Sequence, residues 1–409
     1  MLNKIWAGFF FVAFAVASIK WLVAGESGIW AALVGAVFEA AKVGFEISLG
    51  LTGVMCLWLG VMRLGERGGA VDLLARGFGP LLRRLFPGVP AGHPAMGSMV
   101  MNMAANMLGL DNAATPLGLK AMKELQSLNP EPERATDDQI LFLVINTAAV
   151  TLIPATIFVY RAQLGAADPT DVFIPLLIAT FCGTLVGVLV TAVIQRLKLW
   201  DPVVLAYLGG MTALVGGLAL YFSRLPREVM ERQASLLSNF VIFSVIIVFL
   251  ALAVKKSVPV YEAFVDGAKD GFQVAIGIIP FLVAMLVAIA VFRASGALDS
   301  LLAGVRWAVE GAGLDTRWVD GLPTALMRPL SGSGARGLML ETMKAQGPDS
   351  FAGRLVSVIQ GSTETTFYVL AVYFGSVGIK RTRHATACGL IADLASLVAA
   401  ILVTYLFFG

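Results

Sequence analysis

Long uncharged apolar stretches, separated by short polar or charged segments, dominate the chain. A helix rises about 1.5 Å per residue, so about 20 apolar residues cross the ~30 Å hydrocarbon layer of a membrane. The pattern therefore predicts an all-α integral membrane protein with nine full crossings. We place these crossings at residues 5–24, 47–62, 139–160, 172–195, 202–223, 233–254, 271–292, 355–379 and 385–408.

Three segments beside these crossings mix polar and apolar residues. Residues 28–45 are mixed in this way, which predicts an interfacial segment. Residues 63–90 carry arginines among Leu, Val and Phe, which predicts a basic amphipathic segment lying along the lipid headgroups. Residues 293–318 mirror that segment in the second half of the chain.

Residues 101–123 are apolar on both sides of a polar break. Each side offers only about a dozen helix-like residues, too few to cross a membrane. The sequence thus predicts a re-entrant hairpin over residues 95–127, in which two half-helices meet at a polar tip; a soluble loop between two interfacial helices is the alternative. Such a tip typically marks a binding site, because irregular backbone at membrane depth must be sheltered by protein or water. The break contains Asn102, Asn106, Asp111, Asn112, Thr115 and Pro116.

A second copy of this neighbourhood follows about 220 residues later. Four blocks recur in the same order, which indicates duplication rather than a coincidence of composition. The aligned blocks are residues 41–50 with 268–277, 69–72 with 296–299, 111–123 with 332–344, and 144–151 with 358–365. We therefore predict a second hairpin at residues 320–346 and two halves, residues 1–198 and 199–409.

The two halves are predicted to face opposite ways in the membrane. Four crossings separate the two copies of the crossing that precedes the hairpin, so the copies run in opposite directions. An inverted repeat of this kind places its site at the membrane midplane, between the halves. With the amino terminus in the cytoplasm, the cytoplasmic segments hold 17 of the 30 Lys and Arg residues, and the positive-inside rule favours that orientation.

Composition narrows the function. The chain is 58% hydrophobic and 14% charged, which places it in the membrane class with the lipid bilayer as a partner. Its net charge of +3 is small and dispersed, so no nucleic-acid partner is expected. The three cysteines lie singly in apolar runs, and no catalytic motif such as a P-loop or a GxSxG sequence occurs. We expect no enzyme activity, no metal site and no cofactor, and the sequence leaves the formation of a homo-oligomer open.

Polar residues at membrane depth carry the candidate chemistry. Glu364 lies inside the crossing at residues 355–379, where an ionisable group is costly and therefore functional by default. It either contacts a substrate or cation, or forms a helix-packing ion pair with Arg328 or Arg336. These two arginines bracket a Gly/Ser-rich tip, whose backbone N–H groups suit an anion or carboxylate; snorkelling to the interface is the alternative for both. The predicted substrate-binding residues are Asn112, Thr115, Arg328, Ser331, Ser333, Arg336, Gln360, Ser362, Thr363 and Glu364.

The first hairpin has the opposite chemistry. Carboxylate, amide and hydroxyl oxygens with freed carbonyls suit Na⁺, or a proton on the carboxylate, as a coupling ion. The predicted coupling-ion residues are Asp111, Asn112, Asn146 and Thr147. Thr151 lies beside them in the sequence, and Asn102 and Asn106 share a helix face that could line the same cavity or hydrogen-bond between helices.

Long motifs in both halves resemble a known family. Residues 93–122 and 146–156 are similar to spore maturation protein A, and residues 277–299, 327–337, 347–351, 360–380 and 389–394 are similar to spore maturation protein B. The chain therefore resembles a fusion of the two, joined near residues 199–202. Those proteins belong to the nucleoside recognition or Gate class, shared with concentrative nucleoside transporters and ferrous-iron transport protein B.

The resemblance implies a bacterial inner membrane and a transporter-like core. From the nucleoside transporters only the tip and broken-helix locations carry over, onto residues 111–115, 146–147, 331–336 and 360–365. Two arginines beside the site argue against an uncharged nucleoside. The first hypothesis is an ion-coupled secondary transporter for a small anionic or zwitterionic metabolite. The second is a non-transporting scaffold or regulator of envelope or spore-maturation processes, and the third is a metal or nucleoside permease.

Overall fold

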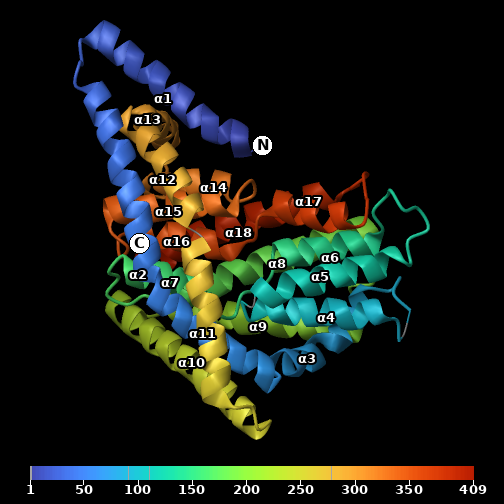
Figure 1. The fold of residues 1–409 in the computed structure, drawn as a ribbon. Coiled ribbons are helices and arrows are strands. Elements are labelled where there is room, and N and C mark those ends of the chain that lie inside the picture. The colour runs from blue at the N-terminus through green and yellow to red at the C-terminus, as the bar shows by residue number, and fades with distance from the viewer. Residues whose placement is uncertain (1, 91, 110, 278) are drawn as a thin grey trace.

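The protein consists of helices joined by turns. The computed structural model describes residues 2–90, 92–109, 111–277 and 279–409, without the side chains of residues 2–5, 51, 111–113, 227, 228, 231 and 281. These ranges contain no β-strand, and Figure 1 shows their helical arrangement. In the first half the helices are α1 Leu2–Ala24, α2 Ile29–Gly68, α3 Ala70–Leu85, α4 Pro94–Met107, α5 Asp111–Gln126, α6 Asp137–Thr147, α7 Ala155–Gln163 and α8 Phe173–Gln195. They continue with α9 Pro202–Ser223, α10 Arg227–Lys255, α11 Val260–Gly277, α12 Ile279–Ala294, α13 Ala297–Gly311, η1 Arg317–Gly321, α14 Leu322–Met327, α15 Gly332–Gln346, α16 Phe351–Ser362, α17 Thr366–Ser376 and α18 Ala385–Phe408.

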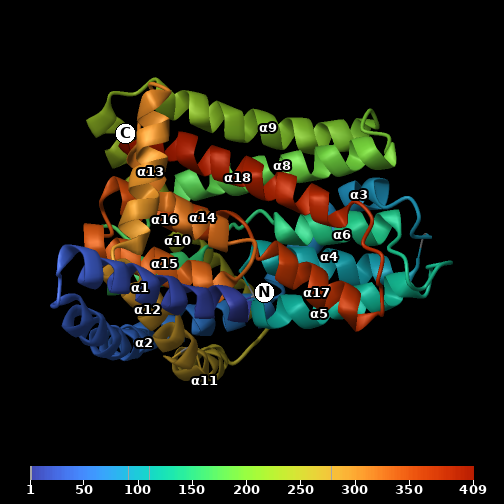
Figure 2. The same ribbon diagram turned by 90° about the horizontal axis from the view of Figure 1, so that it is seen from above.

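The all-α membrane fold is confirmed. Among the described residues, seven helical stretches are long and apolar enough to cross a membrane. They coincide with seven of the nine predicted crossings. The other two predicted crossings are helices broken in the middle, α6 with α7 and α16 with α17. Figure 2 shows α1, α2 and α13 at one end of the molecule and the α4–α6 helices with α17 at the other.

One predicted element is wrong. Residues 28–45 do not form a separate interfacial segment, because α2 runs without interruption for 40 residues, or about 60 Å at 1.5 Å per residue. Neither a proline nor a pair of glycines interrupts the helix, and its charged side chains in this segment form ion pairs at the exposed surface. Lys42 pairs with Glu46 one turn on, at 3.7 Å, and Glu39 accepts from Lys344 at 3.2 Å. The helix ends at Gly69, whose φ of +84° closes it.

Helices that correspond between the two halves pack against each other in opposite directions. Along α2 and α11–α12, Gly44 lies against Val283 and Met55 lies against Gly271. Residue numbers therefore rise along one helix as they fall along the other. The same holds for α8 and α18, which follow the broken helix of each half, where Gly183 lies against Ser396 and Gly187 against Ala392. Corresponding helices of an inverted repeat run in opposite directions, and the inverted repeat stays a prediction.

The α2–α11 contact depends on glycine at position 271, and this gives a test. A Cβ at Gly271 would lie 2.6 Å from the carbonyl oxygen of Met55, so one of the two helices must shift. We expect the overpacking in Gly271→Ala to lower the free energy of unfolding by about 1–3 kcal/mol. The higher helix propensity of alanine offsets up to ~1 kcal/mol of this loss. Gly277→Ala, on the same helix but with no atom near the new Cβ, is the control and should be neutral or stabilising. Thermal unfolding in detergent compares them; equal melting temperatures would contradict the close packing.

Asp138 gives a second test, of pH dependence. It lies in the polar segment ahead of a broken crossing, where burial raises its pKa to about 6 despite a hydrogen bond with the Gly88 backbone. A raised pKa stabilises the fold below the ordinary value of 3.8, and this contribution is lost as the pH rises through about 6. We therefore expect Asp138→Asn to raise the melting temperature more at about pH 8 than at about pH 5. An equal change in melting temperature at both pH values would show that the pKa of Asp138 is not raised.

Candidate functional site

The hairpins and the broken helices of both halves meet at one place. In the first half the Leu152 N–H, in the break between α6 and α7, donates to the carbonyl of Met107 at the hairpin tip, at 2.8 Å. In the second half the Phe367 N–H donates in the same way to the tip carbonyl of Pro329, at 3.1 Å. The two breaks also touch each other, because the Glu364 N–H donates to the Thr147 carbonyl at 2.8 Å. Backbone groups at the breaks are therefore satisfied by the hairpin tip of the same half and, through the Glu364–Thr147 bond, by the other half.

A polar cavity of about 120 Å³ opens beside this junction. Both halves contribute to its wall, which includes the first tip, both breaks and the second hairpin. The polar side chains that line it are Asn106, Thr151, Thr156, Tyr160, Arg328, Arg336, Gln360 and Glu364. The cavity thus brings together four of the predicted substrate-binding residues: Arg328, Arg336, Gln360 and Glu364.

Arg328 connects the second tip to the second break. It is only 7% exposed and directly follows α14. Its guanidinium donates to the Thr363 carbonyl and to the Thr365 hydroxyl, the latter at 3.5 Å, and lies 3.6 Å from the Glu364 carboxylate. The ion pair foreseen for Glu364 is therefore made with Arg328. The Glu364 side chain is still 54% exposed, so it faces the open space of the cavity.

Arg336 approaches the cavity from the first turns of α15. Its guanidinium carbon lies 5.5 Å from the ring centroid of Tyr160, a cation–π contact with a residue of the other half. Ser331 caps the same helix by accepting the Gly334 N–H at 3.0 Å, with the Ser333 hydroxyl 3.3 Å away. A helix amino end and an arginine here both favour a negative group in the cavity.

Gln360 is incompletely satisfied. Its side-chain amide donates to the Gly332 carbonyl at 3.4 Å, while its carbonyl oxygen is buried without a hydrogen-bond partner in the described part of the chain. A buried acceptor without a partner costs free energy, which a ligand N–H or O–H would recover.

Of the remaining predicted residues whose side chains the structure describes, Thr115, Ser331, Ser333, Ser362 and Thr363 are not among those that line the cavity. Ser362 donates to the Ile359 carbonyl at 3.0 Å, Ser331 and Ser333 contact each other, and Thr363 meets Arg328 through its backbone. Thr115 is half-buried on α5, outside the lining. Asp111 and Asn112 begin α5, but their side chains lie outside the described residues.

The predicted coupling-ion residues of the first break are engaged within the protein. Asn146 accepts from the Asn106 amide at 2.7 Å and donates to the Phe142 carbonyl at 2.8 Å. The Thr147 hydroxyl donates to the Val144 carbonyl at 2.9 Å. Asn102 similarly donates to the Ala114 carbonyl at 2.7 Å, which ties together the two arms of the first hairpin. These amides stabilise the broken backbone, and an ion here would rely on main-chain carbonyls.

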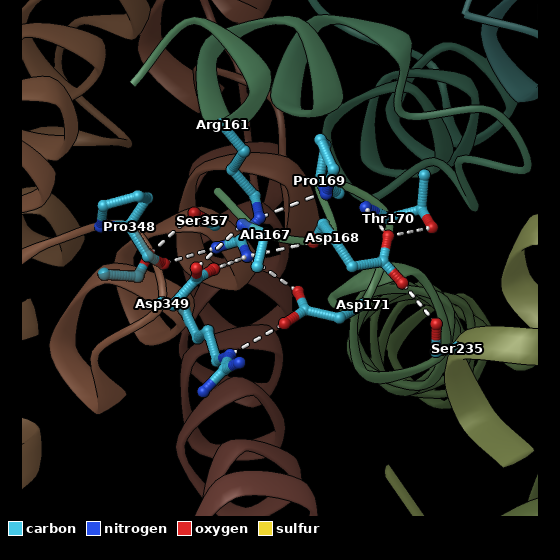
Figure 3. A network of polar contacts seen from close by, with 12 residues as sticks. Arg161, Ala167, Asp168, Pro169, Thr170, Asp171, Ser235, Pro348, Asp349 and Ser357 are labelled. Carbon is cyan, nitrogen blue, oxygen red and sulfur yellow. Dashed lines mark hydrogen bonds and ion pairs between the residues drawn. The ribbon is translucent and has the colours of Figure 1, made fainter. Parts of the chain in front are cut away.

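A buried polar network around Arg161, the residue after the cavity-lining Tyr160, was missed from the sequence (Figure 3). Arg161 is fully buried and donates to Asp171 at 2.8 Å, to Asp349 at 3.0 Å and to the Pro348 carbonyl at 2.7 Å. Asp168 receives hydrogen bonds from Thr170, Ser235 and Asn239. Although burial favours its neutral form, these hydrogen bonds lower the pKa of Asp168. The network joins the α7–α8 loop to the α15–α16 loop and to α10, and so fixes the halves against each other.

The chain matches a protein family, two related proteins and a solved structure. The Gate family, described as nucleoside recognition, matches residues 48–166 and 275–380. Spore maturation protein B of Bacillus subtilis is 52% identical over 154 residues, which cover 38% of this chain and 85% of that protein. Spore maturation protein A of the same organism is 41% identical over 155 residues, covering 38% of this chain and 79% of that protein. Among solved structures, the YdaH transporter of Alcanivorax borkumensis aligns over 98% of this chain and 97% of its own, with 17% identity and a TM-score of 0.38.

Proposed function

The chain belongs to the Gate (nucleoside recognition) family, and from this premise we propose that it is a secondary transporter for a small anionic or zwitterionic metabolite. It is a multi-pass membrane protein that combines spore maturation protein A-like and B-like sequence in one polypeptide. Helices broken at membrane depth around a polar cavity are typical of secondary transporters. We place it in the bacterial inner membrane with a cytoplasmic amino terminus.

One observation carries the proposal: Arg328, Arg336, Gln360 and Glu364 line a single cavity between two hairpins and two broken helices. Two guanidinium groups and a helix amino end favour a carboxylate or phosphate on the substrate. The carbonyl oxygen of Gln360, which has no partner among the described residues, accepts from a substrate N–H or O–H. Glu364, exposed in the same cavity, suits the ammonium group of a zwitterion.

Substrate binding would compete with an existing contact. The Arg328–Glu364 pair, at 3.6 Å, joins the hairpin tip to the break in α16–α17. A substrate carboxylate drawn to Arg328 would weaken this pair and loosen the tip from the break. Binding would thereby favour movement of the hairpin, as alternating access requires. A coupling ion, Na⁺ or a proton, completes the scheme, with Asp111, Asn112, Asn146 and Thr147 as its proposed surroundings.

The test is flux into proteoliposomes that contain the purified protein. A panel of small carboxylates, phosphates and amino acids, with uridine as an uncharged comparison, is offered under Na⁺ and pH gradients. We expect saturable uptake of an anionic or zwitterionic member and none of uridine. A folded protein that moves no member under either gradient would favour the scaffold hypothesis, and uptake of uridine alone would favour a nucleoside permease.

A further inference from the structure

A carboxylate lies inside the last membrane-spanning helix, outside the cavity. Asp393 is the ninth of the 24 residues of α18, more than two turns from its beginning, and is 8% exposed. A charged group at this depth is costly, so its presence calls for a function. Neither the substrate contacts nor the proposed surroundings of the coupling ion include it.

The two oxygens of this carboxylate have different environments. Oδ2 accepts a hydrogen bond from the Thr366 hydroxyl at 2.6 Å. Oδ1 is buried and has no hydrogen-bond partner among the described residues. A buried carboxylate oxygen without a donor is unfavourable, and a proton bound there removes both the charge and the missing hydrogen bond.

The carboxylate is connected to the cavity by a short path. Thr366 is the first residue of α17 and follows Thr365, whose hydroxyl accepts from Arg328 at 3.5 Å. Arg328 is therefore linked to two carboxylates: directly to Glu364 in the cavity, and to Asp393 in the helix bundle through the adjacent residues Thr365 and Thr366.

We propose that Asp393 is a proton-binding site coupled to the cavity through Arg328 and Thr366. When Asp393 is ionised, its charge offsets that of Arg328 and weakens the attraction of the cavity for an anion. When Asp393 takes up a proton, Glu364 alone still offsets the positive charge of Arg328, so the cavity attracts an anion more strongly. Proton and anion then bind together, which is the requirement for proton-coupled uptake. This inference rests on the proposed function for its role in transport, while the proton site itself can be tested separately.

Other charged groups on the neighbouring elements lie toward the ends of α18. Asp137 of α6 pairs with Arg383, just before the helix begins, at 2.8 Å. Arg354 of α16 stacks on Phe408, the last residue of the helix, at 4.5 Å. On α10, charges occur only near its two ends. The titratable side chains of α8 and α17 are Cys182, Tyr368 and Tyr373, and neither helix carries Asp, Glu, Lys, Arg or His.

A proton fits this site better than a metal cation. Hard cations need several oxygen ligands, and the described contacts of Asp393 supply one hydroxyl. The nearby positive charge of Arg328 would also repel a metal ion. A proton needs only the unpaired Oδ1.

Infrared difference spectroscopy on the full-length protein in lipid nanodiscs tests the site without a substrate. We expect acidification to produce a carbonyl band from a protonated carboxyl group, absent in Asp393→Asn and shifted in frequency in Thr366→Val, which keeps the carboxyl but loses its donor. Asp270→Asn, a partly exposed carboxylate on α11, should retain the band. If Asp393→Asn retains every carboxyl band of the unchanged protein at each pH at which the protein is folded, the proton site is overturned.

Coupling to the cavity is tested by Arg328→Gln in the same experiment. Loss of the nearby positive charge should move the pH midpoint of the Asp393 band to higher pH, by about one unit or more. An unchanged midpoint would overturn the link to the cavity. Because neither readout involves flux, a failed proton site and a failed transport proposal give different results.

Discussion

Replacing Arg161 with methionine should lower the free energy of unfolding by about 3–5 kcal/mol, the largest loss of stability that we expect from one substitution. Arg161 is fully buried and pairs with Asp171 and Asp349 from two different loops. Methionine fills much of the space but leaves both carboxylates and the Pro348 carbonyl without their shared donor. Removing one partner of a buried ion pair leaves an uncompensated charge, which costs more than the pair itself contributes.

Thermal or denaturant unfolding in detergent, followed by tryptophan fluorescence, measures this loss. Arg354→Met is the matched control, because Arg354 donates to the other oxygen of Asp171 at 2.8 Å but keeps 26% of its side chain exposed. We expect a smaller loss there, because the Arg354 side chain keeps contact with solvent and Asp171 keeps its bond from Arg161. Equal losses for the two variants would show that burial of Arg161 does not decide the stability of the network.

Replacing Arg336 with glutamine should reduce uptake of the substrate at least about 30-fold, or roughly 2 kcal/mol of binding free energy. Arg336 contacts the Tyr160 ring and lines the cavity, so its loss removes a charge-assisted contact without removing a buried ion pair. Arg336→Lys keeps the charge but not the planar guanidinium that can form two parallel hydrogen bonds. Its uptake should lie between that of Arg336→Gln and that of the unchanged protein.

Flux into proteoliposomes gives the comparison, and Arg83→Gln on the exposed face of α3 serves as the control. The transport proposal expects normal flux from Arg83→Gln and the loss from Arg336→Gln. The scaffold hypothesis expects the reverse in cells, with the amphipathic arginines essential and Arg336 dispensable.

The elements of the fold could be predicted because each has a local cause. Apolar length predicted the seven apolar spans, and the resemblance to the nucleoside transporters located a broken helix in each half, at residues 146–147 and 360–365. The structure has these breaks between Thr147 and Ala155 and between Ser362 and Thr366. The continuity of α2 was missed because Glu39, Lys42 and Glu46 resemble an interfacial pattern. Lys42 and Glu46 pair with each other one turn apart, but Lys344, the partner of Glu39, is 305 residues away in the second half and outside any local window.

The site was predicted less completely, for a related reason. Arg328, Arg336 and Glu364 could be chosen because charge at membrane depth is rare and costly. Arg161 gave no such signal. Its partner Asp349 is 188 residues away, and the importance of Arg161 comes from its complete burial, which the sequence does not show. The pairing of Thr366 with Asp393 likewise depends on how α17 packs against α18, which no spacing in the sequence encodes.

The most direct test of the central claim is a cryo-electron microscopy map of the protein in nanodiscs with the anion that the flux panel selects. We expect new density in the cavity, between the Arg336 guanidinium and the Gln360 side chain and within hydrogen-bond reach of both. Density for that anion at another place, with this cavity unchanged, would contradict the claim that the junction of the two hairpins and the two broken helices is the substrate site.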